Sequence, residues 1–279
     1  MATVEKLKEQ VVATKPKKAT FSAFLTSDAI KYKINQMIAG KDGDKFITSL
    51  ISVVSNNPQL AECEHATILS SALLGESLKL SPSPQLGQFY IVPFKDNKNN
   101  RTVATFQLGY KGYIQLAIRS GYYKKLNVLA VKEGELKHYN PLDETLEVEL
   151  IQDEAEREKA PTIGYYAMFE YHNGFVKSLY WSKAKMLAHA QKYSQSYRTD
   201  LNRGYSYSFW SKDFDSMAFK TMLRQLISKW GIMSIDFQNA YIKDMSMITD
   251  NGQPQYIDNV QEEENIIETA DAVAVGEGE

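Results

Sequence analysis

The first third of the chain carries apolar residues at helical spacing. Phe46, Leu50 and Val53 recur at intervals of three and four residues, as on one face of an amphipathic helix. Ser27 is a suitable N-cap for an earlier helix, which is expected to end before Gly40. The Ser-Pro-Ser-Pro run at residues 81–84 breaks the helical pattern. The predicted helices span residues 27–37, 44–55 and 64–79.

Segments rich in β-branched and aromatic residues follow. Residues 88–94 and 102–108 flank a polar loop, which predicts a β-hairpin, and the turn sequence His172-Asn173-Gly174 predicts another. Further strands are expected at 124–132, 145–151, 163–171 and 175–181. Further helices are expected at 110–119, 183–193, 211–230 and 237–245. This order predicts an α+β fold in which an antiparallel, hairpin-rich β-sheet packs with several helices.

Charge is distributed unevenly along the chain. The formal net charge is -2, but nine of the 34 acidic residues lie in 249–279, where there is no Lys or Arg; this leaves 32 basic against 25 acidic groups in 1–248. A basic body favours a polyanionic partner, with an ordinary solvated surface as the alternative. We expect a flexible basic arm at 1–25, a folded core at 26–246 and an acidic disordered tail at 247–279.

The sequence lacks the phosphate-binding loop that an ATP-driven enzyme requires. Gly40-Lys41 is followed by Asp42, and no glycine stands five residues upstream. We therefore expect neither ATP nor another cofactor, with Mg²⁺ at most as a counterion.

Two groups of acidic residues have only part of a metal-site pattern. Glu135-Leu136-Lys137 has the Glu-x-Lys spacing of some nuclease cores but no preceding Pro-Asp pair. Asp213 and Asp215 fall where a helix begins, so helix capping is the favoured interpretation and metal binding the less favoured one. The four histidines share no ligand spacing, and Cys63 is expected to be a buried thiol. No catalytic or metal-binding residue is therefore predicted.

The predicted helix 110–119 has two distinct faces. Lys111, Gln115 and Arg119 form a polar stripe at i, i+4 and i+8. One helical turn rises about 5.4 Å, close to the phosphate spacing of a nucleic-acid strand, and Gly109 leaves backbone amides at the helix start. A solvated surface stripe is the alternative. The opposite, core-facing side is expected to hold Tyr110, Tyr113, Ile114, Ala117 and Ile118.

Aromatic and basic residues are interleaved further along the chain. Residues 193–198 and 203–207 alternate tyrosines with Arg and small polar residues, which suits stacking on bases; a loop whose tyrosines pack on the core is the alternative. Helix 211–230 is expected to place its basic residues opposite its apolar arc. The predicted nucleic-acid contacts are Thr105, Gln107, Tyr110, Lys111, Gln115, Arg119, Lys124, Lys125, Lys185, His189, Lys192, Tyr197, Arg198, Arg203, Tyr205, Tyr207, Lys212, Lys220 and Arg224.

Three runs of the sequence closely resemble the RecT family (RecT/Redβ type) of phage single-strand DNA annealing proteins. They are LSPSPQLGQFYIVPF from Leu80 to Phe94, FQLGYKG from Phe106 to Gly112, and WSKDFDSMAFK from Trp210 to Lys220. The likeness covers roughly residues 25–245 in the same order.

The resemblance implies an ATP-independent protein of homologous recombination, not an enzyme, that binds single-stranded DNA and retains the annealed duplex. It implies self-association into a ring or helical filament through the core 26–246. It also implies a cytoplasmic role in the bacterial host, beside a phage exonuclease and a host single-strand binding protein, with the acidic tail as docking segment. No membrane contact is expected. A metal-dependent nuclease and an RNA-binding or structural nucleoprotein remain as alternatives.

Overall fold

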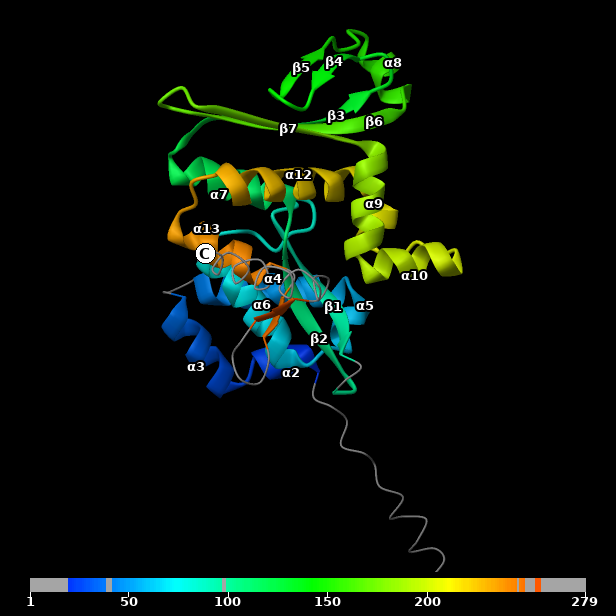
Figure 1. Ribbon diagram of the computed structural model, residues 1–279. Helices are drawn as coiled ribbons and strands as arrows, with labels where there is room; N and C mark the ends of the chain where they lie inside the picture. Colours follow the sequence, from blue (N-terminus) through cyan, green and yellow to red (C-terminus); the bar gives the residue numbers. More distant parts are fainter. Residues whose placement is uncertain (1–19, 39–41, 97–98, 245, 249–253, 257–279) are drawn as a thin grey trace, which may run out of the picture.

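The computed structural model describes residues 20–38, 42–96, 99–244, 246–248 and 254–256 (Figure 1). A group of helices precedes the first strand: α2 (Phe21–Leu25), α3 (Asp28–Met37), α4 (Asp42–Ser55), α5 (Pro58–Ala61) and α6 (His65–Ser77). The three predicted helices are confirmed as α3, α4 and α6. Ser27 is the N-cap residue of α3, although its hydroxyl donates to the Phe24 carbonyl instead of accepting from the helix.

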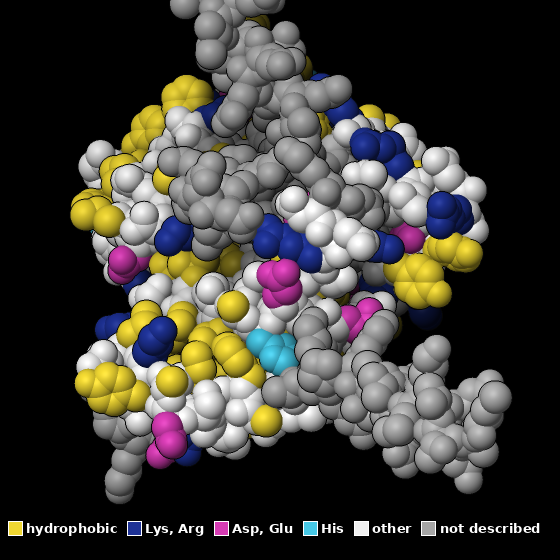
Figure 2. Space-filling model, turned by 90° about the horizontal axis from the view of Figure 1, so that it is seen from below, with side chains coloured by type: hydrophobic (Ala, Val, Ile, Leu, Met, Phe, Trp, Pro, Cys, Tyr) yellow, Lys and Arg dark blue, Asp and Glu magenta, His cyan; other side chains and the backbone are white. Residues whose placement is uncertain are grey.

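The first hairpin packs on these helices. Strands β1 (Phe89–Asp96) and β2 (Arg101–Leu108) pair antiparallel, which confirms the predicted hairpin. Phe89 stacks on Phe106 at 5.1 Å between ring centroids, and it lies so close to α6 that a Cβ added to Gly75 would stand 2.2 Å from its ring. Seen from this end, hydrophobic side chains gather in patches with Lys and Arg between them (Figure 2).

A second antiparallel sheet has the order β3 (Tyr123–Lys132), β6 (Thr162–Tyr171), β7 (Val176–Ser182). The predicted turn between β6 and β7 is confirmed, and Gly174 supplies its positive φ of 86°. Side chains alternate along β6 as strand geometry requires: Tyr165 and Phe169 are buried, whereas Met168 on the other face is half-buried.

The connection between β3 and β6 forms a small layer over this sheet (Figure 1). It contains β4 (Leu136–Asn140), β5 (Thr145–Val148) and α8 (Glu154–Lys159). Glu135 anchors the layer from a fully buried position, because it accepts hydrogen bonds from Arg157 (2.6 Å) and from the amides of Lys132 and Ile151. Burial alone would raise the pKa of Glu135, but these hydrogen bonds outweigh it and lower the pKa.

Helices join the two sheets: α7 (Tyr110–Ser120), α9 (Lys183–Tyr193), α10 (Gln195–Arg203), α11 (Phe209–Lys212) and α12 (Phe214–Trp230). Figure 1 shows α7 and α12 side by side beneath the β3-β6-β7 sheet. The helices α2–α6 and the β1–β2 hairpin make up the first lobe. α12 contributes Leu223 and Ile227 to the core of this lobe, and Met222 and Leu226 to the core under the β3-β6-β7 sheet. The predicted helix 211–230 is thus divided into α11 and α12.

The C-terminal part of the described chain returns to the first lobe. It comprises α13 (Ile235–Lys243), β8 (Ser246–Ile248) and β9 (Pro254–Tyr256), and the first sheet has the order β1-β2-β8-β9. The predicted α+β class with antiparallel sheets is confirmed. Among the described helices, none combines the length and the apolar character needed to cross a bilayer.

Both predicted boundaries of the core need correction. Phe21 and Leu25 of α2 are buried, so the end of the predicted arm belongs to the fold because its apolar side chains fill the core. Residues 254–256 pair with β8, so the start of the predicted tail is part of a sheet. The remainder of both predictions, 1–19, 249–253 and 257–279, lies outside the described residues.

Candidate nucleic-acid interface

The α7 helix presents the predicted polar stripe. Lys111, Gln115 and Arg119 are all exposed, and Tyr113 is fully buried beneath them. The prediction for Ile118 is wrong: its side chain is 58% exposed, because it points into an open groove instead of the core.

The start of α7 lies against the turn before β1. The Gly109 amide donates to the Gln88 carbonyl at 2.9 Å. A Cβ on Gly109 would lie 2.2 Å from the Gly87 carbonyl oxygen, and one on Gly112 would lie 2.1 Å from that of Gln88. These close approaches require glycine at both positions, and they fix where Lys111 leaves the helix.

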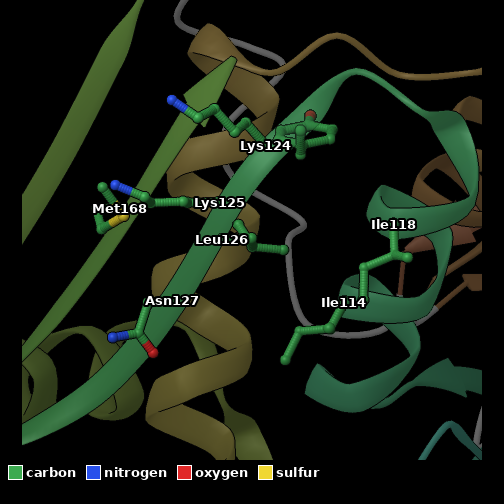
Figure 3. Close-up of a pocket in the computed structure, with 8 residues that line it drawn as sticks. Ile114, Ile118, Lys124, Lys125, Leu126, Asn127 and Met168 are labelled. Carbon is green, nitrogen blue, oxygen red and sulfur yellow. The ribbon is translucent and has the colours of Figure 1, made fainter. Parts of the chain in front are cut away.

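A groove with a volume of about 490 Å³ separates α7 from β3. In Figure 3 Ile114 and Ile118 extend from α7 toward β3, and Leu126 points from β3 toward them. Lys125 and Met168 lie on the far side of β3. The groove is lined by Ile114, Ile118, Tyr123, Lys124, Lys125, Leu126, Asn127 and Met168. It therefore combines an apolar wall with cationic side chains at its edge.

Two lysines of β3 share one carboxylate. A register shift between Tyr123 and Lys125 places Lys124 in a bulge, so that both lysines reach Glu170 of β6. Lys125 pairs with it at 2.9 Å, and the hydrogen bonds from Lys124 and Lys125 lower the pKa of Glu170. The lysine side chains are 51% and 63% exposed, so the group presents a net positive charge to the solvent.

A second surface carries exposed tyrosines. Tyr205 and Tyr207 are 50% and 70% exposed, and their rings lie edge to face at 5.4 Å. Asp200, only 4% exposed, holds this loop by accepting from the Ser208 amide (2.7 Å) and the Ser211 hydroxyl (2.6 Å). Burial would raise the pKa of Asp200, but hydrogen bonding outweighs it and lowers the pKa to about 2.

Cations and rings alternate along α9. The His189 ring lies 5.3 Å from Trp181 and 4.6 Å from Tyr193. Lys185 stands over Trp181 at 4.5 Å and Lys192 over Tyr193 at 4.8 Å, in cation–π geometry. Both lysines are exposed, as are Arg203 and Lys212 nearby in the sequence.

Tyr90 connects the two surfaces. Its ring lies 5.6 Å from Phe209 of α11, and its cross-strand partner is Gln107. A Cβ on Gly87 would stand 3.2 Å from the Tyr90 hydroxyl and 3.4 Å from Lys111 Cδ, so Tyr90 and Lys111 flank the same glycine. The sequence-based prediction omitted Tyr90 and Phe209. Strand alternation from the buried Phe89 would have indicated that Tyr90 faces outward.

Lys220 and Arg224 do not belong to an exposed face. They donate to the carboxylate of Asp244, which is fully buried, at 2.9 Å each, and Lys220 itself is 5% exposed. Asp244 also accepts from the Leu108 amide and the Tyr113 hydroxyl. The predicted face is wrong because α12 lies between two cores, which bury its polar arc as well as its apolar one.

Four more residues of the predicted interface pack or hydrogen-bond within the fold. Thr105 is 1% exposed and donates to the Val92 carbonyl. Tyr197 is 7% exposed and packs near Trp210, because the segment predicted as a loop forms α10. Arg198 donates to the carbonyls of residues 191 and 192 at the end of α9, where a cation satisfies carbonyls without helical partners. Tyr110 is half-buried against Phe219.

The carboxylates considered as metal ligands are engaged elsewhere. Asp213 caps α12 by accepting from the Ser216 amide at 3.0 Å, which confirms the capping interpretation, and Asp215 accepts from the Tyr165 hydroxyl. Glu135 is buried with Arg157, whereas Lys137 pairs with Glu149 at the surface. Within the described ranges no group of three or more His, Cys, Asp or Glu is arranged to hold a metal ion. Cys63 is buried, as predicted.

Comparison with known proteins identifies the family. Residues 44–263 match the model of the RecT family. The chain belongs to the RecT family. It is similar to the Bacillus subtilis (strain 168) protein YqaK, named as uncharacterized, with 36% identity over 250 residues, 88% of this chain and 81% of that one. It is also similar to Protein RecT of Escherichia coli (strain K12), with 27% identity over 204 residues, 72% and 71% of the two chains.

RecT-family membership confirms the resemblance found in the sequence. It places the chain among the phage-type recombination and annealing proteins. The matched region begins in α4 and includes α7, β3 and the tyrosine-bearing segment before α11. Both surfaces described above therefore lie within the part of the chain that matches the family.

Proposed function

We propose that the protein binds single-stranded DNA along α7 and β3 and pairs it with a complementary strand without ATP. The observation that carries this proposal is the placement of Lys111, Gln115 and Arg119 on one exposed face of α7, together with the exposed Lys124 and Lys125 of the neighbouring strand β3. RecT-family membership supports it independently.

The α7 stripe suits a sugar-phosphate backbone. Residues four apart on a helix are separated by about 6 Å along its axis, which is near the spacing of phosphates in a strand. Arg119 donates to the Leu78 carbonyl at 2.6 Å, which orients a guanidinium that has five donors in total. Phosphate contacts carry no base information, so binding would be independent of sequence.

The aromatic surface suits the bases. Every base has a π-face, so the exposed rings of Tyr205 and Tyr207 would stack on any of them. Tyr90 and Phe209 lie between these tyrosines and Lys111, so a strand following α7 would continue onto the rings. Bases held by stacking leave their pairing edges available for a complementary strand.

We also propose that copies assemble side by side on the strand as a ring or filament. Large apolar side chains are exposed where α12 ends and α13 begins: Trp230 (50%), Ile232 (45%) and Ile235 (77%). Exposed apolar groups at one edge are typical of contact between protein surfaces. A phage exonuclease and a host single-strand binding protein remain proposed partners of the acidic tail, and electron microscopy of the DNA complex would test the assembly.

The salt dependence of binding tests the DNA proposal. Affinity for labelled oligonucleotides of unrelated sequence should be equal and should fall by orders of magnitude between ~50 and ~200 mM salt. A flat salt response, or preference for a ribose-bearing strand through its 2′-hydroxyl, would contradict it. The labelled strand must also stay intact with Mg²⁺ or Mn²⁺, because degradation would indicate a nuclease instead.

A further inference from the structure

The edge of strand β3 that faces α7 has no strand partner in the described part of the chain. β3 is an outer strand of its sheet and pairs only with β6 there. The Ala130 carbonyl accepts from Arg157 at 2.9 Å and so points away from β6. Register is unbroken from Leu126 to Ala130, so Leu126 and Val128 direct their backbone groups to the same free edge.

Leu126 lines the groove beside α7, and Val128 follows it along the same edge of β3. Among the described residues, the backbone of Leu126 and Val128 makes no hydrogen bond outside the β3–β6 ladder. Ile114 and Ile118 extend from α7 toward β3, whereas the side chains of Lys124 and Lys125 extend from the other side of the strand (Figure 3). An extended segment would find main-chain partners, an apolar wall and positive charge together, which is the arrangement used in strand addition.

We propose that this groove binds the chain's own C-terminal segment, residues 257–279. The segment contains eight acidic side chains and no Lys or Arg, complementary to the lysines of β3. Apolar residues of the segment, among them Ile257, Val260, Ile266 and Ile267, would contact the wall formed by α7. The basic N-terminal arm lacks this complementarity because it would bring further lysines to Lys124 and Lys125.

The length of the segment allows it to reach the groove. The described chain ends at Tyr256 in β9. Residues 257–279 span up to about 75 Å when extended, at ~3.3 Å per residue. A folded unit of this size has a radius of gyration of about 18 Å, so the segment reaches any point on its surface.

Docking of this segment would regulate DNA binding. This consequence rests on the proposed function, because the segment and the DNA would contact the same Lys124 and Lys125. An incoming strand with several phosphates would displace the segment. Docking of the segment would therefore be autoinhibitory, and single-stranded DNA would release it.

Hydrogen exchange in the full-length protein tests the docking. The variant Glu262→Gln/Glu263→Gln/Glu264→Gln weakens the charge complementarity while keeping the length. A tethered segment at an effective concentration of ~1 mM that binds with a Kd of ~0.1 mM occupies its site about nine-tenths of the time, so its release would speed exchange at the Leu126 and Val128 amides about tenfold. The other outer strand, β7, should be unchanged.

A matched variant controls for the change in charge. Glu154→Gln/Glu156→Gln/Glu158→Gln removes three exposed acids of α8 and should leave β3 exchange as in the parent. Unchanged β3 exchange in the Glu262 to Glu264 variant overturns the docking, whatever the DNA affinity. Faster β3 exchange without any binding of single-stranded DNA supports the docking and instead contradicts the proposed function.

Discussion

Asp244 accepts a hydrogen bond from the Tyr113 hydroxyl at 3.1 Å inside the protein, and so ties the end of α13 to the underside of α7. Burial raises the pKa of Tyr113 well above its usual value, and the negative charge of Asp244 raises it further, so the hydroxyl remains protonated and acts as a donor. Lys220 and Arg224 complete the network from α12. The helix with the polar stripe is therefore held by a buried carboxylate as well as by apolar packing.

Replacing Asp244 should destabilise the protein strongly. Asp244→Asn removes the anion that compensates Lys220 and Arg224, and breaking a buried ion pair in this way costs about 3–5 kcal/mol. Denaturant unfolding measures the loss. Asp236→Asn, at the exposed first turn of α13, is the control and should cost no more than about 1 kcal/mol. A free energy of unfolding within ~1 kcal/mol of the parent for Asp244→Asn would disprove the network's role.

Removing one lysine from α7 and one from β3 should weaken DNA binding equally for all sequences. In Lys111→Ala/Lys124→Ala, Glu170 keeps Lys125 as partner, so folding should be preserved. For every phosphate that is no longer neutralised, the slope of log affinity against log salt should fall by ~0.7 for a single strand. The control Lys33→Ala/Lys159→Ala removes two exposed lysines from α3 and α8 and should leave the slope unchanged. Equal salt slopes for the two double variants would contradict the proposal that DNA follows α7 and β3.

Substitution of the exposed tyrosines should lower the affinity for single strands without changing its dependence on salt. Tyr205→Ala or Tyr207→Ala should cost ~1–3 kcal/mol of binding to single strands, the value of one stacked base, without changing the salt slope. Tyr32→Ala, which removes a tyrosine 65% exposed on α3, is the control. Fluorescence titration gives both quantities. If both loop variants bind like the control, stacking at this surface is wrong.

The stability of the tyrosine-bearing loop should depend on pH through Asp200. Its folded-state pKa of about 2 lies below the ordinary value of 3.8, so the ionised carboxylate stabilises the fold above pH ~4 and this contribution is lost as the pH falls toward 2. Asp200→Asn should therefore be less stable at pH 7, and the difference from the parent should shrink between pH ~4 and ~2. Urea unfolding at several pH values checks this, and a constant difference would contradict it.

Much of the fold follows from local pattern. The hairpins β1–β2 and β6–β7 follow from alternation and turn sequence, and the α7 stripe follows from helical spacing, because each signal involves neighbours in sequence. The segment of α10 contains Ser, Tyr and Arg without a clear apolar period, so the sequence does not predict its helix; Ser194 caps it and Tyr197 buries one face.

The missed parts of the site depend on residues that are distant in sequence. The amide of Leu108 meets Asp244 across 136 residues, and no local pattern predicts that pairing. Lys220 and Arg224 look like a solvated arc when α12 is read alone, and only a second core on its other side buries them. The groove beside α7 similarly depends on β3, which leaves Ile118 exposed although its spacing predicts burial.

The rate at which two complementary oligonucleotides pair, measured by fluorescence quenching with the purified full-length protein and no nucleotide, decides whether the protein anneals DNA. We expect the protein to accelerate pairing, and added ATP to leave the rate unchanged. Pairing no faster than in the absence of protein, or acceleration only with ATP hydrolysis, would contradict the proposed function.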